Sequence, residues 1–268
     1  MKKIIALVLT LTLVLALVAC GGNAADDKTI KVGATPAPHA EILEVVKEIL
    51  AEDGWTLEIK EFDDYIIPNT SLEEGELDAN YFQHVTYMNN FNVEQGTHLV
   101  SAAGIHYEPF GLYAGKAASV EELSDGAQIA VPNDATNEAR ALLLLEQVGL
   151  ITLKEGVGIN ATKSDIAENP KNIEIVETKA ELIPTTLQDV DLAVINGNYA
   201  IDAGLKIADA LAVEAADGAA AEAYVNVIAV KEGNENSEKI QALVNALKSE
   251  KVKAYIEETY AGAVVPLF

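Results

Sequence analysis

The chain has 268 residues, 50% of them hydrophobic, and its 42 acidic and 18 basic side chains give a net charge of −24. So negative a surface excludes nucleic acid and anionic lipid head groups as partners, because both would be repelled. The length and the hydrophobic fraction allow one or two domains with a substantial core.

Residues 1–19 are predicted to be a secretory signal peptide. Lys2 and Lys3 precede an apolar run over 4–18. This run is shorter than the roughly 20 residues that a membrane-spanning helix needs. An uncleaved anchor helix at the N-terminus is the alternative.

The single cysteine, Cys20, stands where this apolar run ends. The sequence Leu-Val-Ala-Cys over 17–20 resembles the lipobox of bacterial lipoproteins. That resemblance implies that Cys20 carries lipid, palmitate included, and that residues 20–28 form a tether to the membrane. An acylated Cys20 leaves no thiol for a disulfide, a metal site or a nucleophile.

The remaining chain alternates strand-like and helix-like segments. Strands are predicted over 29–34 and 55–62, with a helix over 41–51 whose apolar residues recur at helical spacing. The same order returns later as a strand over 127–131, a helix over 136–149 and a strand over 173–177. The repeated βαβ pattern predicts an α/β fold with two lobes, each a mostly parallel sheet flanked by helices.

Two extended stretches predict where the chain passes between the lobes. One covers 104–113 and the other 224–230. Lobe 1 is therefore expected to comprise 29–109 plus 225–268, and lobe 2 to comprise 110–224. Small ligands of such proteins bind in the cleft between the lobes, near the carboxyl ends of strands.

Arg140 is the only arginine, and every other basic residue is a lysine. It lies about one turn inside the helix that follows the strand over 127–131. Asp134 or Thr136 is the predicted N-cap of that helix. A helix N-terminus presents unpaired N–H groups and a positive dipole end, and both favour an anion.

The side chain of Arg140 is expected to lean back over Asn137 toward that helix N-terminus. A guanidinium binds a carboxylate through two parallel hydrogen bonds, which lysine cannot imitate. We therefore predict that Arg140 clamps a ligand carboxylate. The alternative is a surface arginine paired with Glu138 or Glu146.

Aromatic residues cluster over 62–69 and 78–87. Tyr65, Phe82 and Tyr87, together with His84, follow strand ends and are predicted to line an amphipathic pocket. The alternative places aromatic residues of this stretch, such as Tyr81 and Phe82, in the core.

The histidines permit a second hypothesis, a zinc or manganese site with a carboxylate ligand. No two of them have tight ligand spacing, so a hydrogen-bonding role is favoured and no metal is expected. The residues concerned are His39, His84, His98, His106 and Glu108.

Enzyme signatures are missing from the sequence. It has no G-x-S-x-G, H-E-x-x-H or P-loop motif, and Gly156-Val-Gly158 lacks the third glycine of a dinucleotide site. A binding protein without a cofactor is therefore predicted.

Several long motifs together resemble the methionine-binding lipoproteins that serve ABC importers, over essentially the whole mature chain. They are PHAEIL (38–43), FDDYIIPN (62–69), DANYFQHVTY (78–87), IHYEPFGLY (105–113), PNDATNEARALLLL (132–145), DVDLAVINGNYA (189–200) and AGAVVPLF (261–268). The fold of that family is the two-lobed type 2 periplasmic-binding architecture.

The resemblance implies a role for each matching residue. Tyr65, Phe82, His84 and Tyr87 would enclose the thioether side chain, and Arg140 would hold the carboxylate. Asn198 and Asn226 would fix the polar end of the amino acid, with Asn196 as the alternative to Asn198.

The resemblance also implies partners and location. The ligand would be L-methionine or a close analogue, and the partner would be the membrane permease of an ABC importer. The protein would be a monomer, attached through Cys20 to the extracytoplasmic face of the cell membrane. D-methionine, a short methionine peptide, another amino acid or a metal stays open as the ligand.

Overall fold

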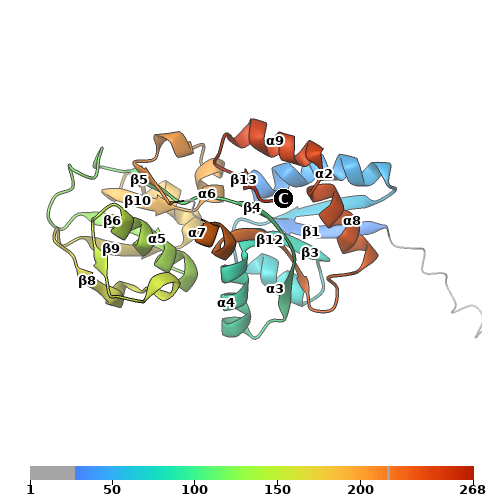
Figure 1. The fold of residues 1–268 in the computed structure, drawn as a ribbon, viewed down its shortest axis with the longest axis horizontal. Helices are drawn as coiled ribbons and strands as arrows, with labels where there is room; N and C mark the ends of the chain where they lie inside the picture. The colour runs from blue at the N-terminus through green and yellow to red at the C-terminus, as the bar shows by residue number, and fades with distance from the viewer. Residues whose placement is uncertain (1–27, 216–217) are drawn as a thin grey trace, which may run out of the picture.

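The computed structural model describes residues 28–215 and 218–268. They form two α/β lobes, each built on its own sheet, which lie side by side along the longest axis of the molecule (Figure 1). The predicted two-lobed α/β architecture is confirmed. The signal peptide and Cys20 lie outside the described residues. Among the residues described, no helix has the length and apolar character needed to cross a membrane.

The first lobe contains a mixed sheet of six strands in the order β13-β4-β12-β3-β1-β2. Strand β1 pairs in parallel with both β2 and β3, as the βαβ pattern predicts, whereas β12 is antiparallel to β3 and β4. The strands are β1 (Thr29–Ala34), β2 (Thr56–Glu61), β3 (Ala79–His84), β4 (Leu99–Tyr107), β12 (Val225–Lys231) and β13 (Val265–Pro266).

The second lobe contains a sheet of five strands in the order β11-β5-β10-β6-β9. Strand β6 is parallel to β9 and β10, and β5 is antiparallel to β10 and β11. A separate two-stranded ladder joins β7 (Thr152–Leu153) to β8 (Ile166–Glu168). The sheet strands are β5 (Gly111–Ala114), β6 (Gln128–Pro132), β9 (Glu174–Thr178), β10 (Leu192–Ile195) and β11 (Ala212–Val213).

Helices flank both sheets. In the first lobe these are α2 (Glu41–Glu52), α3 (Ile67–Glu73), α4 (Val85–Gln95), α8 (Glu238–Leu247) and α9 (Glu250–Tyr260). The second lobe has the long helix α5 (Ala135–Gln147) and the short α6 (Gly197–Asp202), and α7 (Gly218–Ala223) precedes β12. Single helical turns are η1 (Pro36–Ala40), η2 (Gly158–Asn160), η3 (Lys163–Asp165), η4 (Ala180–Thr186) and η5 (Ile207–Asp209).

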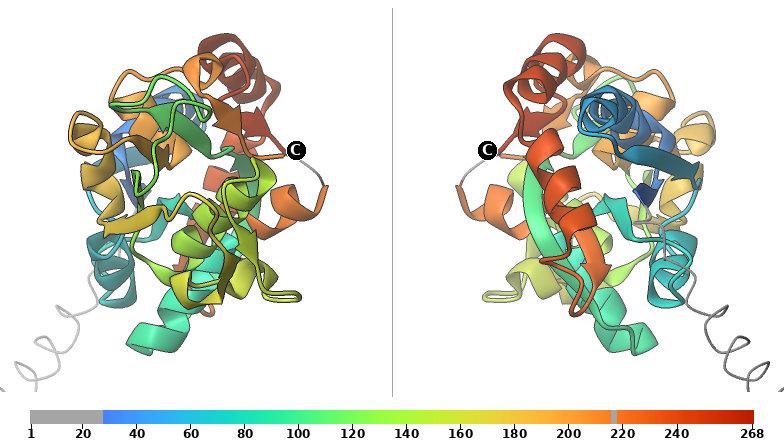
Figure 2. Two further views of the ribbon diagram at one scale, coloured as in Figure 1. Left: turned by 90° about the vertical axis from the view of Figure 1, so that its left-hand side faces the viewer. Right: turned by 90° about the vertical axis from the view of Figure 1, so that its right-hand side faces the viewer.

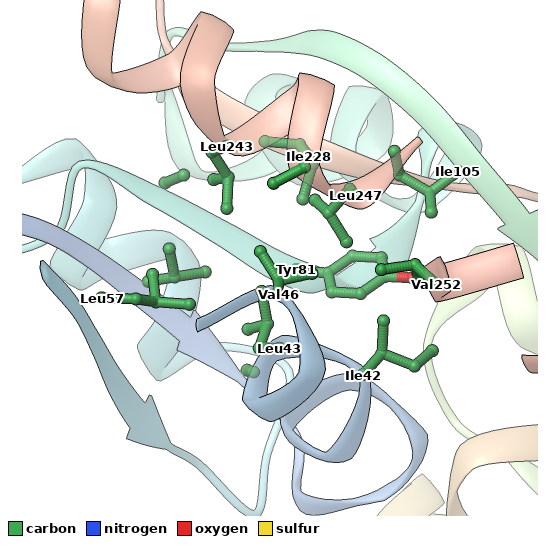
Figure 3. Close-up of a cluster of buried hydrophobic side chains, with 14 of the residues drawn as sticks. Ile42, Leu43, Val46, Leu57, Tyr81, Ile105, Ile228, Leu243, Leu247 and Val252 are labelled. Carbon is green, nitrogen blue, oxygen red and sulfur yellow. The ribbon is translucent and has the colours of Figure 1, made fainter. Parts of the chain in front are cut away.

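The C-terminal helices pack with α2 and complete the core of the first sheet. The end-on views of Figure 2 show α8 and α9 on the same side of the molecule as α2. Tyr81 of β3 lies in the middle of this core and is fully buried (Figure 3). Side chains one helical turn apart on α2 pack against it, together with residues of α8, α9 and β12. They include Ile42, Leu43, Val46, Ile228, Leu243, Leu247 and Val252.

The chain passes twice between the two sheets. It leaves the first sheet after Tyr107 and enters the second at Gly111, and it returns between Val213 and Val225. The first passage is not one continuous strand, as the stretch over 104–113 suggested. It is broken at 108–110, where Pro109 has no N–H to donate to a ladder.

Candidate ligand-binding site

A small cavity lies between the two lobes. All of the residues that the sequence assigns to a ligand line it: Tyr65, Phe82, His84, Tyr87, Arg140, Asn198 and Asn226. The other lining residues are Gln83, Glu108, Phe110, Asn137, Asn196 and Gly197.

One wall of the cavity is aromatic. Phe82 and His84 lie on the same face of β3 because they are two residues apart in a strand. His84 is also the N-cap of α4, and its Nδ1 accepts a hydrogen bond from the backbone N–H of Tyr87 at 3.0 Å. The ring of Tyr65 lies 5.6 Å, centroid to centroid, from the rings of both Phe82 and Tyr87. The result is an apolar wall with a few polar tips.

Hydrogen bonds join the lobes across the cavity. The Tyr65 hydroxyl donates to Oδ1 of Asn198, and the ring of Tyr65 stacks on Tyr199 at 4.9 Å. Nε2 of His84 is 3.1 Å from Oδ1 of Asn137 on α5. Aromatic residues of the first lobe are thus fixed against amides of the second.

Arg140 is buried, with 3% of its surface exposed. Its guanidinium lies between two rings, 3.9 Å from the centroid of Phe110 and 4.3 Å from that of Tyr224. Nε donates to both carboxylate oxygens of Glu214, at 2.8 and 3.0 Å, and Nη2 donates to Oε2 at 2.6 Å. Nη2 also donates to the backbone carbonyl of Glu108 at 2.6 Å. In the described part of the chain, no hydrogen bond uses Nη1.

The alternative expectation for Arg140 is wrong. It is not a surface arginine, and its ion-pair partner is Glu214 rather than Glu138 or Glu146. Those two carboxylates are used elsewhere, because Glu138 accepts the backbone N–H of residue 163 and Glu146 that of residue 153.

The start of α5 is capped by Asp134, one of the two predicted N-cap residues. Its carboxylate accepts from both the backbone N–H and the side-chain amide of Asn137. Among the described residues, the hydrogen bonds of the Arg140 guanidinium do not go to this N-cap. The guanidinium points toward Glu214 and the connection after β4 instead.

Burial alone would lower the pKa of Arg140, but the carboxylate of Glu214 outweighs burial and raises it.

Glu108 is a residue of the cavity that the sequence did not assign to a ligand. It is 5% exposed and follows β4 directly. Its Oε1 lies 2.6 Å from Nε2 of His106 and 3.3 Å from Nε2 of His39. A Cβ at position 197 would lie 2.9 Å from Oε2, so only glycine fits beside this carboxylate. Burial raises the pKa of Glu108, and the nearby His39 and Arg140 oppose that rise.

The two histidines beside Glu108 are neutral near pH 7. Burial lowers the pKa of His39 to about 4 and that of His106 to about 3. Thr35 Oγ1 lies 2.7 Å from Nδ1 of His39, and the Tyr81 hydroxyl is hydrogen-bonded to Nδ1 of His106. The alternation of His106 and Glu108 along an extended segment was a usable signal, because residues two apart in a strand share a face. His39 comes from η1, far away in the sequence.

The asparagines of the Asn-Gly-Asn step differ in what they leave unpaired. Oδ1 of Asn198 accepts the Tyr65 hydroxyl. Asn196 donates through Nδ2 to Asn137 at 3.1 Å, but its buried Oδ1 has no hydrogen-bond partner within residues 28–215 and 218–268. Asn226 is placed by its Oδ1, which lies 3.2 Å from Nε2 of His39. Of these three amides, Asn196 therefore has an acceptor left over in the cavity.

The four histidines do not share one site. His98 is exposed on the surface and bonds Glu73, and His84 is bonded to Asn137. His39 and His106, together with Glu108, place their ligating atoms within 4.8 Å of one another.

Comparisons with known proteins identify the family. The family model described as NlpA lipoprotein matches residues 30–268. A methionine-binding lipoprotein of Bacillus subtilis is 41% identical over 100% of this chain and 99% of its own length. A solved nutrient-binding protein of Burkholderia cenocepacia, bound to methionine, is 42% identical with a TM-score of 0.85, covering 89% of this chain and 100% of that one. A periplasmic substrate-binding protein of an ABC transporter from Coxiella burnetii is 42% identical with a TM-score of 0.83, again over 89% and 100%.

Proposed function

We propose that this chain, which belongs to the NlpA lipoprotein family, captures methionine between its lobes and delivers it to an ABC importer. Relatives that cover nearly the whole chain support this function: one is named for methionine binding, one was solved with methionine bound, and one belongs to an ABC transporter. The protein is a binding component of transport and not an enzyme.

The observation that carries the proposal is the combination of groups around one cavity. An arginine, a carboxylate and an unpaired amide oxygen line it together with a wall of Tyr65, Phe82 and Tyr87. A free amino acid presents one anionic and one cationic group, and methionine adds a flexible, polarisable side chain. Sulfur–aromatic contacts contribute ~0.3–1.5 kcal/mol each, so an aromatic wall suits a thioether.

Arg140 is the group proposed to receive the ligand carboxylate. Glu214 already occupies Nε and Nη2, so the ligand would meet the remaining donors of the guanidinium and not a free fork. The contact is then one charge-assisted hydrogen bond in a desolvated place, which contributes roughly 1.5–3 kcal/mol. Asn137, whose amide lies on the same helix face, stands beside it.

Glu108 is the group proposed to receive the ligand ammonium. Its Oε1 is held by two histidines, and its Oε2 borders Gly197, another lining residue of the cavity. The unpaired Oδ1 of Asn196 is a second acceptor for the same ammonium. Asn198 and Asn226 complete this polar end, Asn198 by fixing Tyr65 and Asn226 by fixing His39. Tyr65, Phe82, His84 and Tyr87 enclose the thioether.

Further proposals concern the organisation and attachment of the protein. The lobes are proposed to comprise 29–109 plus 225–268 and 110–224, acting as a monomer. Cys20 is proposed to anchor the chain by lipid to the extracytoplasmic face of the cell membrane, where an importer permease receives the ligand. Cys20→Ser expressed in a bacterium should then leave the membrane fraction, and a variant that sediments with membranes like the wild type would contradict the anchor.

Calorimetry of ligand-free protein tests the function directly. The protein is unfolded, separated from any bound ligand, refolded, and titrated with a panel of amino acids, with methionine amide and N-acetylmethionine as matched probes. We expect methionine to bind most tightly. The amide should lose the Arg140 contact and the acetylated form the Glu108 contact. Equal binding of unrelated amino acids, or no binding of methionine, would contradict the proposal.

A further inference from the structure

The cluster of His39, His106 and Glu108 has a second chemical capacity. Nε2 of His106 is hydrogen-bonded to Oε1 of Glu108 at 2.6 Å. Nε2 of His39 lies 3.3 Å from the same oxygen and 3.2 Å from Oδ1 of Asn226, and the two ring centroids are 5.2 Å apart. A neutral imidazole has one nitrogen lone pair, and zinc would take it at Nε2 once the proton moves to Nδ1, which faces the hydroxyl of Thr35 in His39 and that of Tyr81 in His106. Two neutral nitrogens and one carboxylate are the donor set of a three-ligand zinc site with an open fourth position.

The distal nitrogens of both rings are already anchored. Thr35 holds Nδ1 of His39, and Tyr81, in the middle of the core, holds Nδ1 of His106. Anchors of this kind orient the imidazoles of metal sites and fix which nitrogen faces the metal. The two rings are therefore held in place before any ion arrives.

The charges around the cluster also favour a cation. Within the described part of the chain, the ion-pair neighbours of Glu108 are the two neutral histidines and no lysine or arginine side chain. A buried carboxylate without a cationic partner is costly, and a bound cation removes that cost. The charge of Arg140 acts on Glu108 and lowers its pKa, but the ion-pair partner of the guanidinium is Glu214.

The three ligating atoms lie within 4.8 Å of one another and must draw together around an ion. Donor atoms around a tetrahedral zinc ion, with bonds near 2.0–2.1 Å, lie about 3.3 Å apart. The His39–Glu108 distance of 3.3 Å already has this value. The His106–Glu108 distance of 2.6 Å must open, and Glu108 has space to withdraw because it borders the ligand cavity.

We propose that His39, His106 and Glu108 form a binding site for one zinc ion at the edge of the methionine cavity. Zinc and the ligand ammonium then compete, because both require the carboxylate of Glu108. By linkage, each lowers the affinity of the protein for the other by the same factor. This competition rests on the proposed function, whereas zinc binding itself does not.

Zinc binding is tested on the untagged, ligand-free protein by competition with a chromophoric zinc chelator. We expect one zinc ion per chain in the wild type. His39→Gln and His106→Gln should each weaken zinc binding at least about tenfold. Tyr81→Phe, which removes an anchor and no ligand, should weaken it on the order of tenfold. The matched control is His98→Gln, because His98 also bonds a glutamate but lies on the surface, and it should bind zinc like the wild type.

Circular dichroism checks that each variant is folded. If a histidine variant does not fold, the zinc affinities of Tyr81→Phe and Thr35→Val, which remove only the anchors of the rings, test the site instead. The site would be overturned if the wild type bound less than one zinc ion per chain. It would also be overturned if all folded cluster variants bound zinc as tightly as the wild type. A zinc concentration that saturates the wild type but not His106→Gln should weaken methionine binding to the wild type at least about tenfold. The methionine affinity of His106→Gln should be the same with and without that zinc. Zinc binding that leaves methionine affinity unchanged would overturn the competition and the ammonium role of Glu108, but not the metal site.

Discussion

The two polar ends of the cavity hold buried charges of opposite sign, and the protein treats them differently. Arg140 is neutralised from within by Glu214, which also accepts from the Tyr107 hydroxyl and the backbone N–H of Phe110. Glu108 has two neutral histidines beside it instead of a cation. At the arginine end the charge is therefore paired within the protein, and the ligand can gain only a hydrogen bond there. At the glutamate end the carboxylate has no cationic ion-pair partner among the described residues, so a positively charged ligand group can pair with it.

This difference predicts opposite consequences for stability and binding. Loss of a charge from a balanced buried pair leaves the partner buried and unpaired, so the fold should suffer. Loss of an unbalanced charge relieves the free protein, so the fold should be spared while the ligand loses its partner.

The largest effect is expected for Arg140→Ala. It leaves the carboxylate of Glu214, whose side chain is 11% exposed, without a cation, at a cost of roughly 3–5 kcal/mol in the free energy of unfolding. Urea unfolding of the ligand-free protein measures this. Adding Glu214→Gln to the variant should restore part of the stability, because the orphaned charge is removed. Stability equal to that of the wild type in the single variant would show that the pair is not structurally important.

Glu108→Gln should give the reverse pattern. Methionine affinity should fall by about 3 kcal/mol, on the order of a hundredfold, because the ammonium loses its counter-charge. The free energy of unfolding without ligand should stay the same or rise.

The pH dependence of binding sharpens this second test. Because burial raises the pKa of Glu108, acidification protonates it sooner than an exposed glutamate, and wild-type affinity for methionine should fall with pH in that range. The affinity of Glu108→Gln should fall less steeply over the same range. If the methionine affinities of the two proteins fell equally with pH, Glu108 would not be the group that binds the ammonium.

A histidine at the arginine end should make the fold sensitive to acid. Burial and the charge of Arg140 lower the pKa of His84 from 6.5 to about 3. Between these values the unfolded chain binds a proton that the folded chain does not, so wild-type stability is lost as pH falls below 6.5. Relative to His84→Gln, the loss at pH 5 should be about 2 kcal/mol. Urea unfolding of both ligand-free proteins at pH 7.5 and pH 5 measures it, and a constant difference would contradict the prediction.

The smallest effect is expected for Asn196→Ala. It removes one neutral acceptor for the ammonium, so methionine affinity should fall by roughly 1 kcal/mol. The methionine affinity of Asn198→Ala is the comparison, because Oδ1 of Asn198 already accepts the Tyr65 hydroxyl whereas Oδ1 of Asn196 has no partner in the described residues. An unchanged affinity in Asn196→Ala would mean that the unpaired oxygen does not face the ligand.

The sequence alone determined the elements and most members of the site. Strand alternation and helical spacing are local, so β1, α2, β2, β6 and α5 could be predicted close to their observed bounds. The same local reasoning placed Phe82, His84 and Tyr87 around the end of a strand and singled out Arg140 as unusual. The long motifs shared with a known family added Asn198 and Asn226.

Only the tertiary structure decided how the buried charges are partnered. Glu214 pairs with Arg140 across 74 positions of sequence, and it comes from a segment with no periodic pattern to mark it. His39 reaches Glu108 from a separate turn, and the unpaired oxygen belongs to Asn196 rather than Asn198 because Tyr65 arrives from the other lobe. A hydrophobic pattern records which face of an element is buried. It does not record which polar groups meet once two lobes close on each other, because that depends on packing between segments far apart in the chain.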